Sequence, residues 1–373
     1  MSLFIRLGKK SCELQRLTRN EHNVSFNIAH RRIGPEVTPF IIAEMSGNHN
    51  QSLERALQIV EAAAESGAHA LKIQTYTADT MTLDLREGEF FVADKNNLWQ
   101  GRTLYDLYAE AHTPWEWHAP IFERARKLGM IPFSTPFDAT AVDYLENLDV
   151  ACYKIASFEN TDLPLIRKVA ATGKPMIIST GMADLAELDE TVRTARSAGC
   201  KDLVLLQCTS TYPATPLDSN LRTIPHMRKA FGCEIGLSDH TMGIGVAVAS
   251  VALGATVIEK HFTLNRLDGG VDSSFSTEPA EMAMLVTESE RAWQGLGHVK
   301  YGPASANEAT SRTYRRSLYV VRDMAAGEAF STENLRAIRP GSGLPPKYCD
   351  ELIGKRVARP VKRGTPASWS LLG

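Results

Sequence analysis

The stretch FIIAEMSGNHNQSLERALQIVEAAAESGAHALKIQTY, residues 40–76, decides the fold. It contains a continuous apolar run at 40–45, an amphipathic segment at 52–68 and a second apolar run at 70–76. Continuous runs of this length are typical of parallel strands that are buried on both faces. The segment between the runs has an apolar stripe at helical spacing and ends at Gly67. The stretch therefore predicts a strand–helix–strand unit with parallel strands.

The same unit recurs along the chain as far as residue 262. Further apolar runs alternate with helical patterns such as ADLAELDETVRTARSAG at 183–199. These runs occupy residues 130–137, 151–157, 175–180, 203–209, 234–239 and 256–262. Eight strands, each followed by helical material, predict a (β/α)8 TIM barrel. The polar and aromatic segment 77–113 is the exception, and we expect it to form an elaborated loop over the site.

The pattern changes near residue 310, where short β-like runs, Gly, Pro and turn signals take over. We expect a TIM-barrel domain over residues 34–297, a linker over 298–312 and a small β-rich domain over 313–373. Residues 1–33 have weak periodicity, and we expect a short lead-in with a hairpin that closes the bottom of the barrel.

Composition excludes several classes of partner. The 373 residues include 41 basic and 43 acidic ones, a net charge of −2, which gives no electrostatic basis for binding nucleic acid or an anionic membrane. No apolar run approaches the roughly 20 residues that span a bilayer, and the N-terminal apolar stretch is too short and broken for a signal peptide. The six cysteines form no CxxC pair and are interpreted as thiols of a reducing compartment. We therefore expect a cytoplasmic protein that acts on small molecules.

Polar side chains stand near the C-terminal end of every predicted strand, where the active sites of TIM barrels lie. They include Glu44, Lys72, Gln74, Thr135, Lys154, Ser157, Glu159, Ser179, Tyr212, Ser238, His240 and His261. Capped turns explain one or two such residues, but they do not explain polar residues at eight strand ends. The pattern favours an enzyme over a binding protein that uses only its small C-terminal domain, because a binding protein needs no such ring.

His240 and His261 follow neighbouring predicted strands, so their imidazoles are predicted to share one divalent cation, with oxygen ligands and water completing the shell. The acidic residues expected nearby are Glu44, Asp239, Glu259 and Asp272. The alternative is that each histidine only donates a hydrogen bond to a loop. For His49, a role in a turn is at least as good an explanation as metal binding.

Lys72 and Lys154 interrupt apolar strands, and a lysine inside a barrel is costly to bury unless it meets an anion. Two such lysines, with the nearby hydroxyl groups, suit a small substrate that carries phosphate and carboxylate. Two alternatives remain open. One lysine forms a Schiff base, as in barrel aldolases, or the lysines form ordinary buried salt bridges with glutamate.

Nine strings in chain order resemble the sialic acid synthase family: IIAEMSGNHNQSLERAL, ALKIQTY, FSTPFD, YKIASFEN, IISTGMA, LLQCTSTYPA, GLSDHTMGIGVAVASVALGA, VIEKHFTLNR and GVDSSFS. The segment from RRSLYV through RPGSGLPP to IGKRVARPVKRGT is similar to the family's C-terminal antifreeze-like (SAF) domain. The resemblance covers about residues 34–373. Within the family, EMSGNHNQSLERAL, YKIASFEN, CTSTYPA and GVDSSFS are most similar to the branch that makes pseudaminic acid. The neuraminic and legionaminic branches tend to have a GPD-type string where this chain has residues 270–272, and an Asn where it has Ser210.

The resemblance implies a reaction. Phosphoenolpyruvate condenses with a 2,4-diacetamido-2,4,6-trideoxy hexose and water, giving pseudaminic acid and phosphate with carbon–oxygen bond cleavage. Synthesis of N-acetylneuraminate or of legionaminate is the alternative within the family. The resemblance also implies a divalent metal on His240 and His261, manganese first and magnesium or cobalt as alternatives, and a domain-swapped homodimer.

The resemblance further implies a role for each site residue. Phosphoenolpyruvate would be held by Lys72, Thr135, Lys154, Ser157, Ser179 and Ser238. The sugar would be contacted by Gln74, Glu159, Tyr212, Asp272 and Arg339, with Arg339 reaching the active site of the partner subunit. Glu44, beside the reacting centre, and Glu159 are the expected catalytic residues. Glu159 is a candidate for proton transfer, and Glu44 and metal-bound water are the alternatives for that role.

Overall fold

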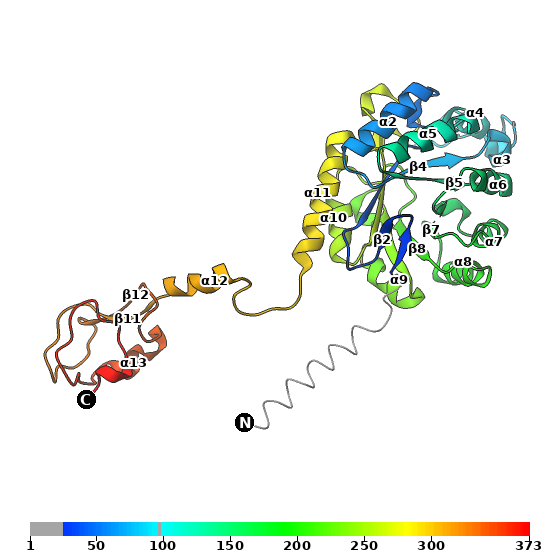
Figure 1. Ribbon diagram of the computed structural model, residues 1–373. Helices are drawn as coiled ribbons and strands as arrows, with labels where there is room; N and C mark the ends of the chain where they lie inside the picture. The colour runs from blue at the N-terminus through cyan, green and yellow to red at the C-terminus, as the bar shows by residue number, and fades with distance from the viewer. Residues whose placement is uncertain (1–24, 96–97) are drawn as a thin grey trace. The chain divides into compact units, whose positions relative to one another are not determined.

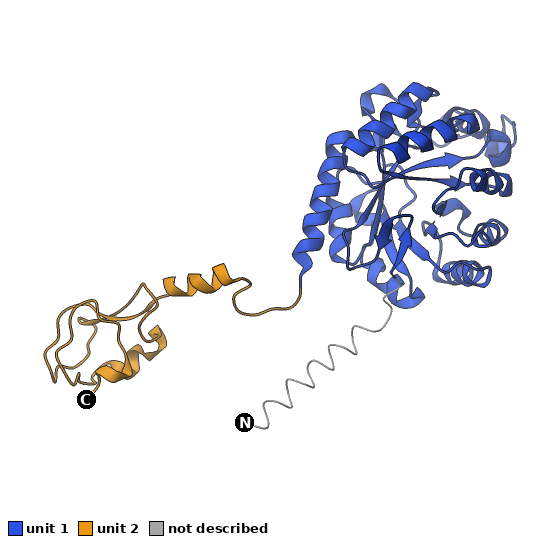
Figure 2. Ribbon diagram, viewed as in Figure 1, with its two compact units in different colours: residues 1–297 blue, residues 298–373 orange. Residues whose placement is uncertain are grey.

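The computed structural model describes residues 25–95 and 98–373. The chain divides into two compact units, residues 1–297 and residues 298–373, shown in different colours in Figure 2. We describe each unit by itself.

Eight parallel strands in the first unit close into a barrel in the order β10-β3-β4-β5-β6-β7-β8-β9 (Figure 1). The strands are β3 (Phe40–Glu44), β4 (Ala70–Thr75), β5 (Ile131–Pro136), β6 (Tyr153–Ile155), β7 (Met176–Ser179), β8 (Leu203–Cys208), β9 (Glu234–Ser238) and β10 (Val257–His261). Almost all of their side chains are buried, because helices cover the outside of the barrel and side chains fill the inside. The TIM barrel predicted from the apolar runs is confirmed.

The helices that surround the barrel are α2 (Leu53–Glu65), α5 (Trp115–Lys127), α6 (Ala139–Asn147), α7 (Leu163–Ala170), α8 (Leu185–Ser197), α9 (Thr223–Phe231), α10 (Gly245–Ala252) and α11 (Pro279–Leu296). Side chains cap the N-termini of two of these helices. The Ser52 hydroxyl accepts a hydrogen bond from the Arg55 N–H and caps α2, and Asp184 with Glu187 forms a capping box on α8.

The segment 77–113 differs from the predicted loop, because part of it is helical. It contains α3 (Ala78–Met81), a 3-10 turn at Gly88–Phe90 and α4 (Leu104–Ala111). Thr77 and Thr103 cap the two α-helices, which explains why a polar segment forms helices here.

The N-terminal lead-in was predicted over residues 1–33. Residues 1–24 of it lie outside the described part of the chain. The remainder contains a hairpin of β1 (Phe26–Ile28) and β2 (Arg31–Ile33), with Ile28 and Ile33 buried in the barrel core.

Alternation along the strands decides which side chains point into the barrel. Lys72 and Gln74 on β4 line the same cavity, as do Glu259 and His261 on β10. Glu44 on β3 is in register with Lys72 on one side and with His261 on the other. Charged groups that lie far apart in the sequence are therefore neighbours at the C-terminal end of the barrel.

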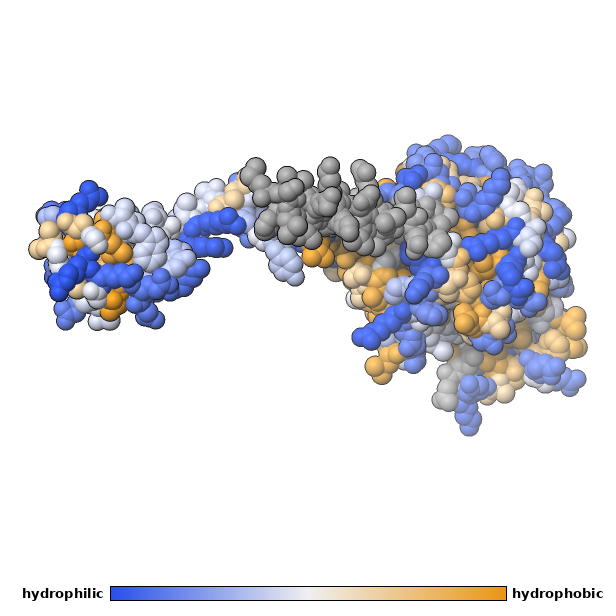
Figure 3. Space-filling model, turned by 90° about the horizontal axis from the view of Figure 1, so that it is seen from below, coloured by the Kyte–Doolittle hydropathy of each residue, from blue (hydrophilic) through white to orange (hydrophobic). Residues whose placement is uncertain are grey.

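The second unit contains α12 (Ala306–Thr310), β11 (Ser317–Val320), β12 (Leu335–Ile338) and α13 (Cys349–Leu352). Strands β11 and β12 pair antiparallel, and residues including Leu318, Phe330 and Leu371 form a separate hydrophobic core. Among the described residues, the helices are too short or too polar to cross a bilayer. The face of the molecule seen in Figure 3 carries hydrophilic and hydrophobic side chains interspersed on both units.

Candidate active site

A cavity of about 410 Å³ lies at the C-terminal ends of the barrel strands. Its polar lining residues come from the strand ends and the turns that follow them: Ser46, Lys72, Gln74, Lys154, Ser157, Glu159, Ser179, Cys208, Tyr212, Ser238, His240, Glu259, His261 and Asp272. Most of the residues predicted from the sequence are thus brought together around one space.

The floor of the cavity is a cluster of buried charges. The Lys72 ammonium lies 2.5 Å from Glu44 Oε2 and 3.8 Å from Glu259 Oε1, and the Lys154 ammonium lies 3.7 Å from the same Glu259 oxygen. All four side chains are almost completely buried. Both lysines are therefore paired with buried glutamates, as the salt-bridge alternative expects.

The balance of charge in this cluster leaves it attractive to an anion. Burial raises the pKa of Glu44 to about 7, although Lys72 opposes the shift. Glu259 remains ionised, because Lys154 and Lys72 overcome the effect of burial and lower its pKa. Burial also lowers the pKa of Lys154, which Glu259 offsets only in part. An anionic ligand would favour the charged form of both lysines.

Hydroxyl groups surround the two lysines. Lys72 Nζ donates to Thr135 Oγ1 at 3.2 Å, and Lys154 Nζ donates to Ser179 Oγ at 2.6 Å. The Ser238 hydroxyl donates to Glu259 Oε1 at 3.1 Å, and Ser157 Oγ accepts from the Gly181 N–H at 3.1 Å. The cavity therefore offers ammonium and hydroxyl donors within a small volume, which suits phosphate and carboxylate oxygens.

Thr135 and Glu44 are not among the lining residues of the cavity, but both contact Lys72, which is. Arg339 belongs to the second unit and directly follows β12.

His240 and His261 face one another with ring centroids 5.3 Å apart. His240 Nδ1 donates to the Thr209 carbonyl at 2.9 Å, so in the neutral ring Nε2 keeps its lone pair; the neighbouring Cys208 raises the pKa of His240 despite its burial. His261 Nδ1 is buried, has no hydrogen-bond partner and lies 3.7 Å from Asp272 Oδ2. Burial and the neighbouring His240 hold the pKa of His261 well below its usual range, so this imidazole is neutral.

Glu159 stands at the rim of the cavity in the turn after β6. Its Oε2 atom is buried without a hydrogen-bond partner. Burial raises the pKa of Glu159 to about 7, and Lys154 opposes the shift. A carboxyl group with a pKa in this range can both donate and accept a proton near neutral pH.

Asp272 is held at the cavity by the Ser46 hydroxyl, which donates to Asp272 Oδ2 and accepts from Gln74 Nε2 at 3.2 Å. Asp239 does not join this group, because it pairs with Lys260 at 2.8 Å on the outer side of β10. The expectation that Asp239 lies beside the histidines is therefore wrong.

His49 holds the turn after β3, as the alternative to metal binding expects. Its Nδ1 accepts a hydrogen bond from the Gln51 N–H at 3.1 Å, so Nε2 carries the proton and contacts Thr113 Oγ1 at 3.3 Å.

One wall of the cavity is apolar, and sequence reasoning did not name its residues. It consists mainly of side chains from segment 77–113 and the β5 and β6 ends: Met81, Val92, Trp99, Leu104, Leu107, Tyr108, Ala111, Phe137 and Phe158. Trp99 Nε1 donates to the Val271 carbonyl at 3.1 Å and ties this wall to the Asp272 loop. The aromatic content of 77–113 was the available signal, but it did not indicate which side chains face inward.

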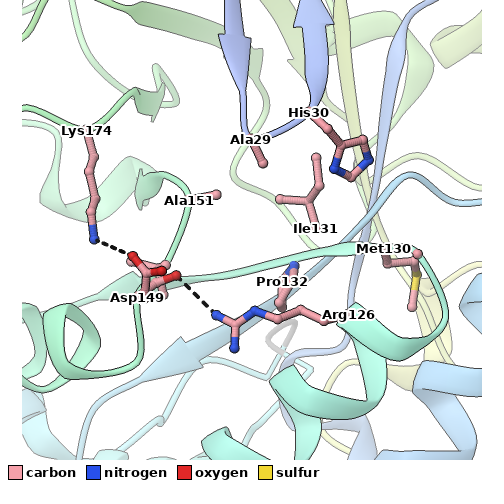
Figure 4. Close-up of a pocket in the computed structure, with 11 residues that line it drawn as sticks. Ala29, His30, Arg126, Met130, Ile131, Pro132, Asp149, Ala151 and Lys174 are labelled. Atoms are coloured by element: carbon pink, nitrogen blue, oxygen red, sulfur yellow. Dashed lines mark hydrogen bonds and ion pairs between the residues drawn. The ribbon is translucent and has the colours of Figure 1, made fainter.

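A second cavity, of about 520 Å³, lies at the opposite, N-terminal end of the strands (Figure 4). Its charged residues are engaged with their neighbours: Lys174 pairs with Glu146 at 2.8 Å and with Asp149 at 3.8 Å, and Arg126 donates to the Asp149 carbonyl. The clustered acids, lysines and histidines of the first cavity make it the candidate active site.

Comparison with known proteins agrees with this choice. The NeuB family model matches residues 59–301, and the SAF domain model matches residues 315–373. The chain belongs to the NeuB family. The resemblance to sialic acid synthases and to their SAF domain is thereby confirmed.

Named members of the NeuB family are similar to this chain over nearly their whole length. A pseudaminic acid synthase of Campylobacter jejuni is 44% identical over 325 residues, covering 87% of this chain and 94% of the relative. A pseudaminic acid synthase of Helicobacter pylori is 41% identical over 330 residues, covering 88% and 96%. The crystal structure of an N-acetylneuraminic acid synthetase from Leptospira borgpetersenii superposes with a TM-score of 0.70 at 32% identity, covering 78% of this chain and 96% of that one.

The paired lysines predict that inorganic phosphate stabilises the full-length chain. At 100 times its Kd, a ligand contributes about 2.7 kcal/mol, so the Tm measured by scanning calorimetry is expected to rise by a few degrees. Lys154→Met is expected to remove this rise, whereas Lys174→Met, at the other end of the barrel, retains it. An equal rise in wild type and Lys154→Met would contradict the assignment of the anion site.

Proposed function

We propose that this chain condenses phosphoenolpyruvate with a 2,4-diacetamido-2,4,6-trideoxy hexose and water, giving pseudaminic acid and phosphate. The observation that carries the proposal is one cavity with a cationic floor and an apolar wall. A small phosphorylated acid fits the floor, and a sugar with methyl and acetyl groups fits the wall. The similarity to two pseudaminic acid synthases supports the same substrates. N-acetylneuraminate and legionaminate synthesis are the alternatives within the family, and the acceptor assay below distinguishes the first of them.

In this proposal the lysine cluster binds phosphoenolpyruvate. Its carboxylate and phosphate oxygens accept hydrogen bonds from Lys72 and Lys154 and from the hydroxyl groups of Thr135, Ser157, Ser179 and Ser238. An anion bound here would interact with both lysine ammonium groups in addition to the carboxylates of Glu44 and Glu259. If the chain were instead a Schiff-base aldolase, borohydride would trap a covalent adduct between substrate and lysine.

The bond changes balance as follows. Carbon 3 of phosphoenolpyruvate forms a bond to the aldehyde carbon of the open-chain sugar, and the aldehyde oxygen takes up a proton. Water adds at carbon 2 and loses a proton, and the carbon–oxygen bond to phosphate breaks. The products are a nine-carbon 2-keto acid and inorganic phosphate.

Two carboxyl groups serve these steps. Glu159 transfers the proton, because it lines the cavity whereas Glu44 is paired with Lys72, and its pKa of about 7 suits both release and uptake at neutral pH. Glu44 lies beside the reacting centre, where its carboxylate stabilises the positive charge that develops at carbon 2. Gln74, Tyr212 and Asp272, which line the same cavity as the apolar wall, contact the sugar.

The residues at the histidine pair fit a divalent metal. The partnerless buried His261 Nδ1, the neutral state of that ring and the orientation of His240 by the Thr209 carbonyl are the features of imidazole ligands. Among the described residues, no group of three or more His, Cys, Asp or Glu is arranged as a complete metal site, so substrate and water oxygens would supply the other ligands. When bound, manganese, or magnesium or cobalt in its place, polarises the aldehyde oxygen.

We expect chelation to abolish phosphate release and added manganese to restore it. His261→Ala is expected to lower the metal content measured by elemental analysis while leaving Tm nearly unchanged, because a strand-end imidazole contributes little core packing. His30→Ala, in the β1–β2 turn, serves as the control. Full activity of metal-free protein would rule out the metal site.

The acceptor is expected to be the 6-deoxy diacetamido sugar and not N-acetylmannosamine. Burial of a methyl group against an apolar wall stabilises the bound sugar by about 0.8 kcal/mol. A hydroxyl group at the same position would be buried without a hydrogen-bond partner. The expected ratio of kcat/KM is roughly 10- to 200-fold, measured by phosphate release at saturating phosphoenolpyruvate and manganese. Equal values would move the assignment to another branch of the family.

We also propose that two chains exchange their C-terminal units, so that Arg339 serves the partner's cavity. Exposed apolar side chains in the loops after the barrel strands support a covering partner: Phe158, Met182, Leu217, Met242 and Leu267. The charges of the units are complementary, since residues 298–373 contain 13 basic and 6 acidic residues whereas residues 1–297 contain 28 and 37.

Mixing inactive Arg339→Ala chains with inactive Lys154→Ala chains, under conditions that exchange subunits, is therefore expected to regenerate activity. Each mixed dimer would contain one cavity with both residues intact. Background activity after proven exchange would contradict shared sites.

The free cysteines in the described residues fit a cytoplasmic location, which cell fractionation tests.

A further inference from the structure

The turn between β3 and α2 contains an unusual run of backbone conformations. Ser46, Asn50 and Gln51 have φ values of 48°, 49° and 55°, in the left-handed region that favours glycine. Each such residue carries a conformational cost and persists only where its surroundings hold it. At Gln51, glycine would remove this cost, so the side chain that is present must contribute something that glycine cannot.

The side-chain amide of Gln51 forms two hydrogen bonds with the C-terminal end of α4. Its Nε2 donates to the Glu110 carbonyl at 2.7 Å and to the His112 carbonyl at 2.9 Å. These carbonyls lie at a helix C-terminus, where backbone acceptors lack partners within the helix. The Gln51 N–H also holds His49, which contacts Thr113 just beyond α4.

Close packing adds to these bonds. A Cβ at Gly47 would lie 3.2 Å from both Cα and Cβ of Ala111. The turn and the last residue of α4 are therefore in direct contact, and a small shift of the turn moves the helix.

The same turn also forms hydrogen bonds with the segment that follows β10 and carries Asp272. Asn48 Nδ2 donates to the Phe262 carbonyl at 2.9 Å and to Ser276 Oγ at 2.8 Å, and the Ser46 hydroxyl donates to Asp272. Helix α4 carries Leu104, Leu107, Tyr108 and Ala111 of the apolar wall. One short turn thus connects the apolar wall and the Asp272 wall, and sets the distance between them.

We propose that Gln51 is a positioning residue for the sugar acceptor. It holds α4 so that the apolar wall and Asp272 both line the space that the sugar occupies. This inference rests on the proposed function, because it assigns the space between these walls to the sugar. The lysine floor that binds phosphoenolpyruvate has no contact with Gln51.

The test is Gln51→Gly, which retains the backbone conformation without strain and removes the amide. The expected result is a rise of about 10- to 100-fold in KM for the sugar, with KM for phosphoenolpyruvate and Tm unchanged. The matched control is Ala29→Gly, because Ala29 also has a left-handed φ, of 50°, and lies in the β1–β2 turn at the far end of the barrel (Figure 4). An unchanged KM for the sugar, or an equal rise in both KM values, would overturn the positioning role.

Hydrogen exchange of the full-length chain separates this inference from the proposed reaction. Amides of residues 104–111 are expected to exchange faster in Gln51→Gly than in wild type or Ala29→Gly. If wild type releases no phosphate with any acceptor, the proposed function fails, and faster exchange in α4 still supports the positioning of the helix. Unchanged exchange in α4 overturns it.

Discussion

The site depends on a single carboxylate shared by two buried lysines. Glu259 lies within 4 Å of both Lys72 and Lys154, at a depth where none of these groups reaches bulk water. Burying an ion costs several kcal/mol unless a partner compensates it. The barrel provides the compensation through alternation along parallel strands, which turns Glu44, Lys72, Lys154 and Glu259 toward one point. The arrangement presents two lysine ammonium groups to the cavity, where the proposed phosphoenolpyruvate would meet them.

Around this floor, the chain divides its functions between strands and loops. Strand ends hold the charged and hydroxyl groups, which must be placed accurately for bond formation, and strands are the most rigid part of the fold. The apolar wall comes from segment 77–113, an insertion between β4 and α5 that the barrel does not need for closure. Differences in acceptor among related enzymes can therefore arise in this segment without disturbing the lysine floor. The turn after β3 joins the two parts, since it is covalently continuous with a barrel strand and contacts α4 directly.

Much of the fold followed from short-range patterns. Continuous apolar runs identified all eight barrel strands, and the apolar stripe at 52–68 identified α2. Both are recognisable because buried strands and amphipathic helices each require a characteristic spacing of apolar residues along the chain. The polar strand ends likewise identified most of the cavity residues, since parallel strands bring their C-terminal ends together whatever the details of packing. Segment 77–113 was predicted as a loop although it contains α3 and α4, because short polar helices held by caps have too weak a stripe to be recognised. Asp239 was misplaced for a related reason: one residue after a strand, the side chain can turn to either side of the barrel, and Lys260 holds it on the outer side.

The sequence by itself determined the barrel, the ring of polar strand ends and the histidine pair, because each depends on residue type and on spacing along one strand. Only the tertiary structure decided how the charges pair, which side chains form the apolar wall and what the turn at 46–51 fastens. These depend on contacts between residues far apart in the chain, such as Lys72 with Glu44, 28 positions apart, and Ser46 with Asp272, 226 positions apart. No local pattern encodes such contacts, since their energies exist only when the closed barrel has brought the segments together.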